Sequence, residues 1–87
     1  MSDYREEHAG AVYAAIDAIG RLQELLAVAT EQCDVAVGTI VSSTGSTEVE
    51  SARNALETMS GCKEKIEEVF GMSIEAIDDL RKYAGGF

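Results

Sequence analysis

The stretch SSTGSTEVE, residues 42–50, decides the fold of this 87-residue chain. Its Gly45 suits the left-handed conformation that often ends a helix. Thr47 and Glu50 have the spacing of a capping box, which is typical of a helix N-terminus. Because the connection is short, the helices on either side of it must lie side by side and antiparallel. We therefore predict an all-α antiparallel two-helix hairpin, one domain over residues 1–87, with a turn formed by Ser43, Thr44 and Gly45.

Apolar residues on both sides of this turn repeat at near-heptad spacing, as in helices that pack along one face. Polar residues interrupt the first stripe at Gln23 and Thr30, and the second at Lys63 and Ser73. Each stripe predicts one long helix. The first stripe comprises Val12, Ile16, Ile19, Leu26, Cys33, Val37 and Ile40; the second comprises Val49, Ala52, Leu56, Met59, Ile66, Phe70, Ile77 and Leu80.

Glycines leave two helix ends open. Gly38 competes with the turn glycine as the end of the first helix, because the β-branched residues 39–41 that follow it are weak helix formers. Gly71 can end the second helix and Ser73 can cap a new one. The sequence thus allows a short third helix near the C-terminus, from about residue 74 to residue 83.

The charge and the N-terminus restrict the partners. Sixteen acidic against seven basic residues give a net charge of −9, which repels phosphate backbones, so we expect no nucleic-acid partner. The start MSDYREEH lacks the basic and apolar regions of a signal peptide. No uninterrupted apolar run approaches the roughly 20 residues of a membrane span. We expect a cytoplasmic protein with no membrane partner, and non-classical secretion is the alternative.

The residue pattern indicates neither an enzyme nor a cofactor or metal site. His8 is the only histidine and has no expected partner or pocket, and no Glu-x-x-His pair is present to hold iron. Residues 42–47 lack the lysine of a phosphate-binding loop. Cys33 and Cys62 are expected to be small buried thiols. A disulfide between them is geometrically feasible in the hairpin, although a cytoplasmic location keeps thiols reduced.

The first arm is too apolar for a lone hairpin. Between residues 9 and 41, 21 of 33 residues are apolar, against 15 of 36 between residues 48 and 83. Side chains off the main stripe, such as Leu25 and Val28, would leave a long apolar surface in water, which is typical of an interface. We expect a homodimer that forms a four-helix bundle, or a similar helical protein as partner. The predicted interface residues are Val12, Tyr13, Ile16, Ile19, Leu22 and Leu26.

Small residues are frequent in the same arm. It contains seven alanines between residues 11 and 36 and also Gly10, Gly20 and Gly38. An interior glycine costs a helix roughly 1 kcal/mol relative to alanine. Three such glycines predict tight helix crossings or local bends, and the alternative is drift in a tolerant helix.

In length, helix number and central turn, the chain resembles the WxG-type helical hairpins of type VII secretion systems. That family has a Trp-x-Gly motif at the turn, where this chain has Ser43-Thr44-Gly45. Its C-terminal Tyr-x-x-x-Asp/Glu signal has no match here, because Tyr83 is followed by Ala-Gly-Gly-Phe. The resemblance implies hairpins that pair into four-helix bundles, and the missing acidic residue argues against autonomous export.

Together these features predict a small acidic interaction protein that acts as partner, chaperone or export adaptor for another helical protein. The alternative is an acidic inhibitor or antitoxin-like protein that blocks a basic surface with a tip formed by Glu31, Asp34, Glu48 and Glu50. The two hypotheses differ in their response to salt. Binding through an apolar face survives high salt, whereas binding through charge weakens as screening rises.

Overall fold

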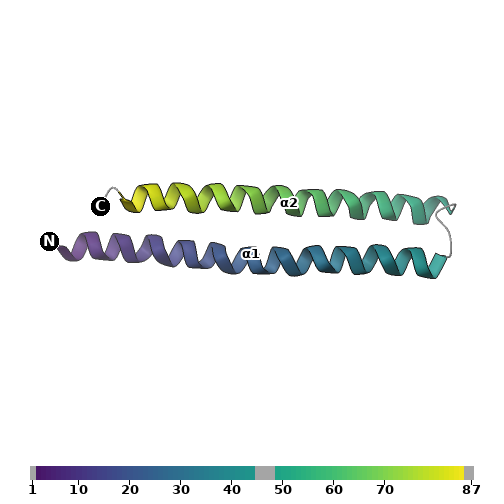
Figure 1. Ribbon diagram of the computed structural model, residues 1–87, viewed down its shortest axis with the longest axis horizontal. Helices are drawn as coiled ribbons and strands as arrows, with labels where there is room; N and C mark the ends of the chain where they lie inside the picture. Colours follow the sequence, from purple (N-terminus) through teal and green to yellow (C-terminus); the bar gives the residue numbers. More distant parts are fainter. Residues whose placement is uncertain (1, 45–48, 86–87) are drawn as a thin grey trace.

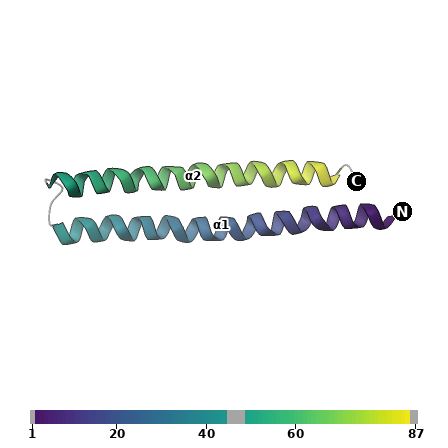
Figure 2. The ribbon, with the colours of Figure 1, turned by 180° about the vertical axis from the view of Figure 1, so that it is seen from behind.

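The computed structural model describes residues 2–44 and 49–85, and these residues form two long helices. Helix α1 spans Ser2–Thr44 and helix α2 spans Glu50–Gly85. They run antiparallel, so that the start of α1 and the end of α2 lie at the same end of the hairpin (Figures 1 and 2). The molecule is a narrow rod of 67 × 15 × 13 Å. The predicted all-α two-helix hairpin is confirmed.

Helix α1 does not end at Gly38 but continues for another turn and a half to Thr44. The hydroxyl groups of Thr39 and Ser43 donate hydrogen bonds to carbonyls one turn earlier in the helix, at 2.8 and 2.6 Å. These bonds let hydroxyl residues remain in a helical segment that they would otherwise tend to leave. Ser43 and Thr44 therefore form the last residues of α1 rather than a turn outside it, and Gly45 lies outside the described residues.

The predicted third helix does not form, because α2 runs unbroken through Gly71. Ser73 does not cap a new helix. Its hydroxyl donates to the carbonyl of Phe70 at 2.6 Å and accepts a hydrogen bond from Gln23 of α1 at 3.0 Å. Met72, between Gly71 and Ser73, is 60 % exposed. The contact across the hairpin uses the serine that the sequence pattern assigned to a helix cap.

The two apolar stripes face each other along a seam between the helices, and the polar residues that interrupt them meet partners. The Gln23 amide donates to Ser73, and the Lys63 ammonium lies 2.8 Å from the Asp34 carboxylate. Asp34 follows Gln23 in α1, whereas its partner Lys63 precedes Ser73 in α2, as expected for antiparallel helices. These two contacts define one antiparallel register.

The seam is thin. Among the described residues, only Val12, Cys33 and Ala52 are buried apolar side chains, and no large side chain is less than 2 % exposed. The other stripe residues are half-buried or, for Val49 and Phe70, exposed. Two helices in contact along a single line cannot enclose a core, and small chains need buried apolar area to be stable. The hairpin alone leaves much of its apolar surface in water.

The glycines are not sites of tight crossing within the hairpin. A Cβ atom built at Gly10, Gly20, Gly38 or Gly71 would meet no other side chain or neighbouring backbone within 4 Å. Helix α1 also continues through its three interior glycines without a break. The prediction of close approach at these glycines is therefore wrong for the contact between α1 and α2.

Candidate interaction surface

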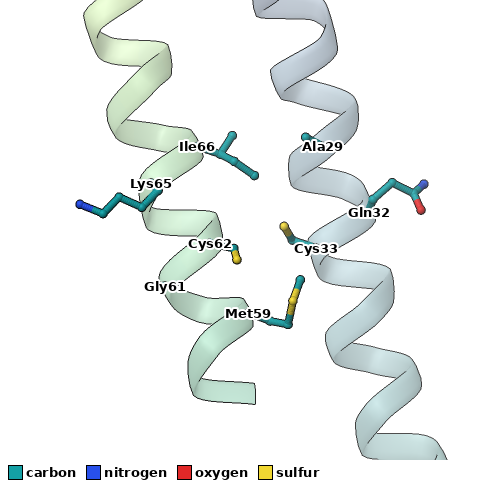
Figure 3. Close-up of a pocket in the computed structure, with 8 residues that line it drawn as sticks. All are labelled: Ala29, Gln32, Cys33, Met59, Gly61, Cys62, Lys65 and Ile66. Atoms are coloured by element: carbon teal, nitrogen blue, oxygen red, sulfur yellow. The ribbon is translucent and has the colours of Figure 1, made fainter. Parts of the chain in front are cut away.

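The seam between the helices has two sides, and the two sides differ in chemistry. On one side, α1 and α2 border an open groove of about 760 Å³. Figure 3 shows Cys33, Met59 and Ile66 pointing into the gap between the helices, whereas Gln32 and Lys65 extend away from it. The groove is lined by Ala29, Gln32, Cys33, Met59, Gly61, Cys62, Lys65 and Ile66.

Helix α1 carries a second apolar stripe on this side. Like the seam stripe, it alternates steps of four and three residues, so its members keep a fixed place beside the seam. It contains no charged residue, and its two leucines are the most prominent members, Leu22 at 42 % and Leu25 at 67 % exposure. We call this set the second stripe: Ala11, Ala15, Ala18, Leu22, Leu25, Ala29, Gln32 and Ala36.

Helix α2 contributes a matching row on the same side. Cys62 lines the groove, and every seventh residue from it occupies the equivalent place beside the seam. All of these positions are apolar, and Val69 and Tyr83 are exposed. We call the second stripe and this row together the apolar flank. The row comprises Ala55, Cys62, Val69, Ala76 and Tyr83.

The opposite side of the seam is charged, and we call it the charged flank. One of its grooves is lined by Asp17, Arg21 and Glu24 of α1, and another by Glu75, Asp78 and Arg81 of α2, with Gln23 lining both. A third hollow on this side includes Glu67. Covering the charged flank would bury several charges, which is costly unless they are paired, whereas the groove on the apolar flank has Lys65 as the one charged residue in its lining.

The ion pairs of the hairpin lie on its exposed surfaces. Lys63 and Asp34 join the two helices across the seam, and the hydrogen bond and the charge of Asp34 raise the pKa of Lys63. Within α2, the hydrogen bond from Lys82 to Asp78 raises the pKa of that lysine in the same way. Both lysines are solvent-accessible, so each pair adds little to stability. The pairs orient surface charges rather than build a reactive site.

The two cysteines occupy the groove as free thiols. Cys33 is buried, as predicted, whereas Cys62 is exposed, so the expectation that both are buried is wrong for Cys62. Cys33 faces the segment around residues 58–62, because Cys33, Met59 and Cys62 line one groove (Figure 3). Cys62 is exposed because it belongs to the flanking row rather than to the seam.

The predicted interface residues fall into three different environments. Val12 is buried, and Ile16, Ile19 and Leu26 are half-buried, so these four belong to the seam with α2. Tyr13 is exposed and comes one position after a seam residue. Ala27, which also comes one position after a seam residue, lines a hollow on the charged flank. Tyr13 therefore lies on the charged side of the seam. Only Leu22 of the six lies on the apolar flank.

Sequence reasoning missed most of the apolar flank. Leu22 and Leu25 were noted as residues off the seam stripe, but the alanines of α1 were linked to close helix approach in general and not to this flank. The signal that could have found the flank is the second four-and-three alternation, from Ala11 to Ala36, without a charge. On a helical wheel, the centres of the two α1 stripes lie roughly 100° apart.

The acidic residues assigned to a binding tip are spread along the rod. Glu31 and Asp34 lie 13 and 10 residues before the end of α1 at Thr44, roughly 20 and 15 Å along the helix axis. Asp34 is also engaged with Lys63. Glu50 starts α2, and Glu48 lies outside the described residues. The described part of the hairpin end therefore gathers less acidic charge than the sequence suggested.

By length and composition, the segment Glu7–Ser43 of α1 is long and apolar enough to cross a membrane, and it contains an 18-residue window with a mean hydropathy of 1.3. The sequence-based expectation considered only uninterrupted apolar runs. Only 6 % of the apolar window is buried inside the hairpin, so its hydropathy does not come from a core. Two packing stripes on one helix account for this composition.

In the part of the chain that the structure describes, no group of three or more His, Cys, Asp or Glu residues could hold a metal ion. No protein-family model, no curated protein and no solved structure matches this chain. The resemblance to WxG-type hairpins therefore stays a prediction from the sequence. The apolar flank is the feature of the hairpin that bears on its function.

Proposed function

We propose that this chain is a helical interaction protein that presents its apolar flank to another helical hairpin and completes a four-helix bundle. In this role it acts as partner, chaperone or export adaptor for a helical protein. The observation that carries the proposal is the apolar flank itself: Leu22, Leu25 and Val69 are exposed beside an open apolar groove, in a molecule without an enclosed core.

The geometry of α1 favours packing in a four-helix bundle rather than packing against a flat surface. In a square four-helix bundle, each helix has two neighbours in directions about 90° apart. The seam stripe and the second stripe of α1 are centred roughly 100° apart, which suits one neighbour on each stripe. Helix α2 covers the seam stripe. The second stripe is the place for a helix from another hairpin.

Charge distribution supports the same choice of surface. The chain carries a net charge of −9, and its acidic residues at positions 17, 24 and 31 of α1 are spaced by seven, so they share one face. Asp17 and Glu24 line a groove on the charged flank. A partner on the apolar flank thus leaves these carboxylates in water, where they keep the complex soluble.

The test is a pair of exposure-matched variants of the full chain. Leu22 and Val41 are both 42 % exposed, but only Leu22 lies on the apolar flank. Leu22→Glu should weaken association at least about tenfold, because the new carboxylate would be desolvated in the contact. Val41→Glu should leave association unchanged. Light scattering and circular dichroism over a range of protein concentrations, at low and high salt, report mass and helicity.

The outcomes separate the two hypotheses about function. Association that survives high salt and is lost in Leu22→Glu supports pairing through the apolar flank. If the chain is monomeric, binding of a hydrophobic dye that is reduced in Leu22→Glu supports an apolar flank that awaits a partner. A stable monomer that binds no dye, or association that Leu22→Glu does not change, would refute the proposal. Association lost in high salt would favour the acidic inhibitor.

A further inference from the structure

We infer that the occupant of the apolar flank is a second copy of this chain, packed antiparallel so that the two α1 helices contact each other through their second stripes. This inference rests on the proposed function and names the partner. Three observations carry it: the second stripe is self-complementary under reversal, the same symmetry axis pairs opposite charges on α2, and the area of the flank is close to the lower limit for a specific interface.

Self-complementarity is required wherever two identical surfaces meet across a two-fold axis. The second stripe satisfies this requirement when it is reversed about the midpoint between Leu22 and Leu25. Leu22 of one copy then lies opposite Leu25 of the other. Outward from this leucine pair, small residues meet small residues, and the only larger side chain is Gln32. The pairs are Leu22 with Leu25, Ala18 with Ala29, Ala15 with Gln32, and Ala11 with Ala36.

The alanines allow the two α1 helices to approach closely, and the leucine pair fills the centre of the contact. The stripe spans 26 residues from Ala11 to Ala36, roughly 37 Å along the helix axis. No charged residue lies within it, so two chains of net charge −9 bring no carboxylates into the contact. Mutual repulsion is limited to exposed charges, which salt screens.

The same axis has a consequence for α2. The hydrogen bond between Gln23 and Ser73 places the midpoint of the second stripe level with residues 72 and 73 of α2. Reversal about that level brings Lys65 of one copy level with Asp79 of the other. Lys65 and Asp79 are the charged members of an outer row of α2 whose residues are spaced by seven. The row comprises Ser51, Thr58, Lys65, Met72 and Asp79. The arrangement pairs opposite charges, which favours it over one that aligns like charges.

The available area also fits a second copy. The second stripe runs along roughly 37 Å of α1 and the row on α2 along roughly 42 Å, and the rod is 13 to 15 Å wide. Covering this flank would bury roughly 500 to 600 Å² on each copy, about 1,100 Å² in total, which is close to the lower limit of roughly 1,200 Å² for a specific stable interface. A short peptide would cover only part of this length.

The alternative symmetric arrangement places the two hairpins parallel, with α1 of each copy against α2 of the other. The second stripe, which has no charge, would then face the outer row of α2 with Lys65 and Asp79. Burying those charges against alanines is unfavourable. The two arrangements also differ in where equivalent residues lie, so distances between spin labels separate them.

The experiment uses the full chain with Cys33→Ala and Cys62→Ala and one new cysteine for a nitroxide label, at Arg21 or at Ser42. Both positions are exposed. Arg21 lies near the axis and Ser42 lies 18 to 19 residues from it. For the antiparallel dimer, pulsed electron resonance should give a short distance, below about 30 Å, for the Arg21 label and roughly 55 Å for the Ser42 label. Light scattering on the same samples gives the mass.

Each outcome supports or refutes the inference. A dimer with one short and one long distance supports it. A dimer with two similar short distances refutes the antiparallel copy but leaves the proposed bundle through the apolar flank intact. A monomer without intermolecular coupling refutes the second copy, and reduced dye binding of Leu22→Glu then still supports the proposed function. If Leu22→Glu changes neither association nor dye binding, both the second copy and the proposed function are refuted.

Discussion

The contact between Gln23 and Ser73 is a hydrogen bond across the seam between two uncharged side chains. Ser73 is 6 % exposed and Gln23 is half-buried. A polar pair in an otherwise apolar seam specifies register, because a shift of one helix along the other leaves buried polar groups without partners. We predict that the two side chains are energetically coupled and that the coupling is about 1 kcal/mol.

The expected magnitude follows from the geometry of each group. Ser73→Ala removes the 3.0 Å bond from Gln23, which costs about 1 kcal/mol, and alanine returns about 0.5 kcal/mol through its higher helix propensity. Gln23→Leu leaves the serine hydroxyl bonded to Phe70, so its cost is small. With both replaced, two apolar residues face each other and no polar group is stranded. The double variant should therefore be at least as stable as the natural chain.

The measurement is urea unfolding followed by circular dichroism for the natural chain, both single variants and the double variant. Protein concentration is held fixed, because association contributes to the apparent stability. Thr30→Ala is the control: its hydroxyl bonds only to Leu26 of its own helix, so it should add independently to Ser73→Ala. A coupling below about 0.3 kcal/mol between Gln23 and Ser73 would contradict the reasoning.

Three further predictions follow from the seam, the glycines and the ion pair. Ile16→Glu should cost about 2–3 kcal/mol, because it places a carboxylate in the seam, and unchanged helicity and size would show that the seam is wrongly placed. Gly38→Ala and Gly71→Ala should each stabilise the hairpin by up to about 1 kcal/mol in thermal unfolding, since nothing lies within 4 Å of the new methyl group; destabilisation would reveal a contact outside the hairpin. Because the pKa of Lys63 is raised above its ordinary value of 10.5, its stabilising effect is complete below that pH and is lost as pH rises through the raised value. Asp34→Asn should remove this alkaline loss in urea titrations, and an unchanged pH profile would contradict it.

The sequence predicted the hairpin because the seam stripes and the short connection leave few other arrangements. It left the helix ends open, because local signals there compete with tertiary contacts. Gly71 and Ser73 together form a good stop and start signal, yet α2 continues because Ser73 bonds to Gln23 across the seam. That contact joins residues 50 positions apart. The helix propensity of single residues cannot predict such a contact. The sequence did show a polar interruption in each stripe, and the hairpin brings Gln23 and Ser73 to the same level.

The candidate site was predicted only in part, and for a physical reason. The sequence showed that α1 has more apolar residues than one seam can use, but it assigned the excess to the largest side chains. Tyr13 is large and exposed, yet it lies on the charged side, whereas the small residues Ala18 and Ala29 lie on the apolar flank. Alanine adds little to any hydrophobicity count, but a row of alanines without charge lets another helix approach closely. The feature that identifies this surface is therefore the spacing and the absence of charge.

A helix with two packing stripes has consequences for how the chain folds. Because few side chains are enclosed by the seam, the isolated hairpin gains little from burial to offset the loss of chain entropy. Covering the apolar flank supplies the missing burial, so folding and association should be linked, and stability should rise with protein concentration. Leu22→Glu would then lower the thermal midpoint as well as the mass, whereas Val41→Glu, at equal exposure, would change neither. A midpoint that is independent of concentration, in a chain that scatters as a dimer, would show that the two helices are stable without the partner and that the thin seam is sufficient.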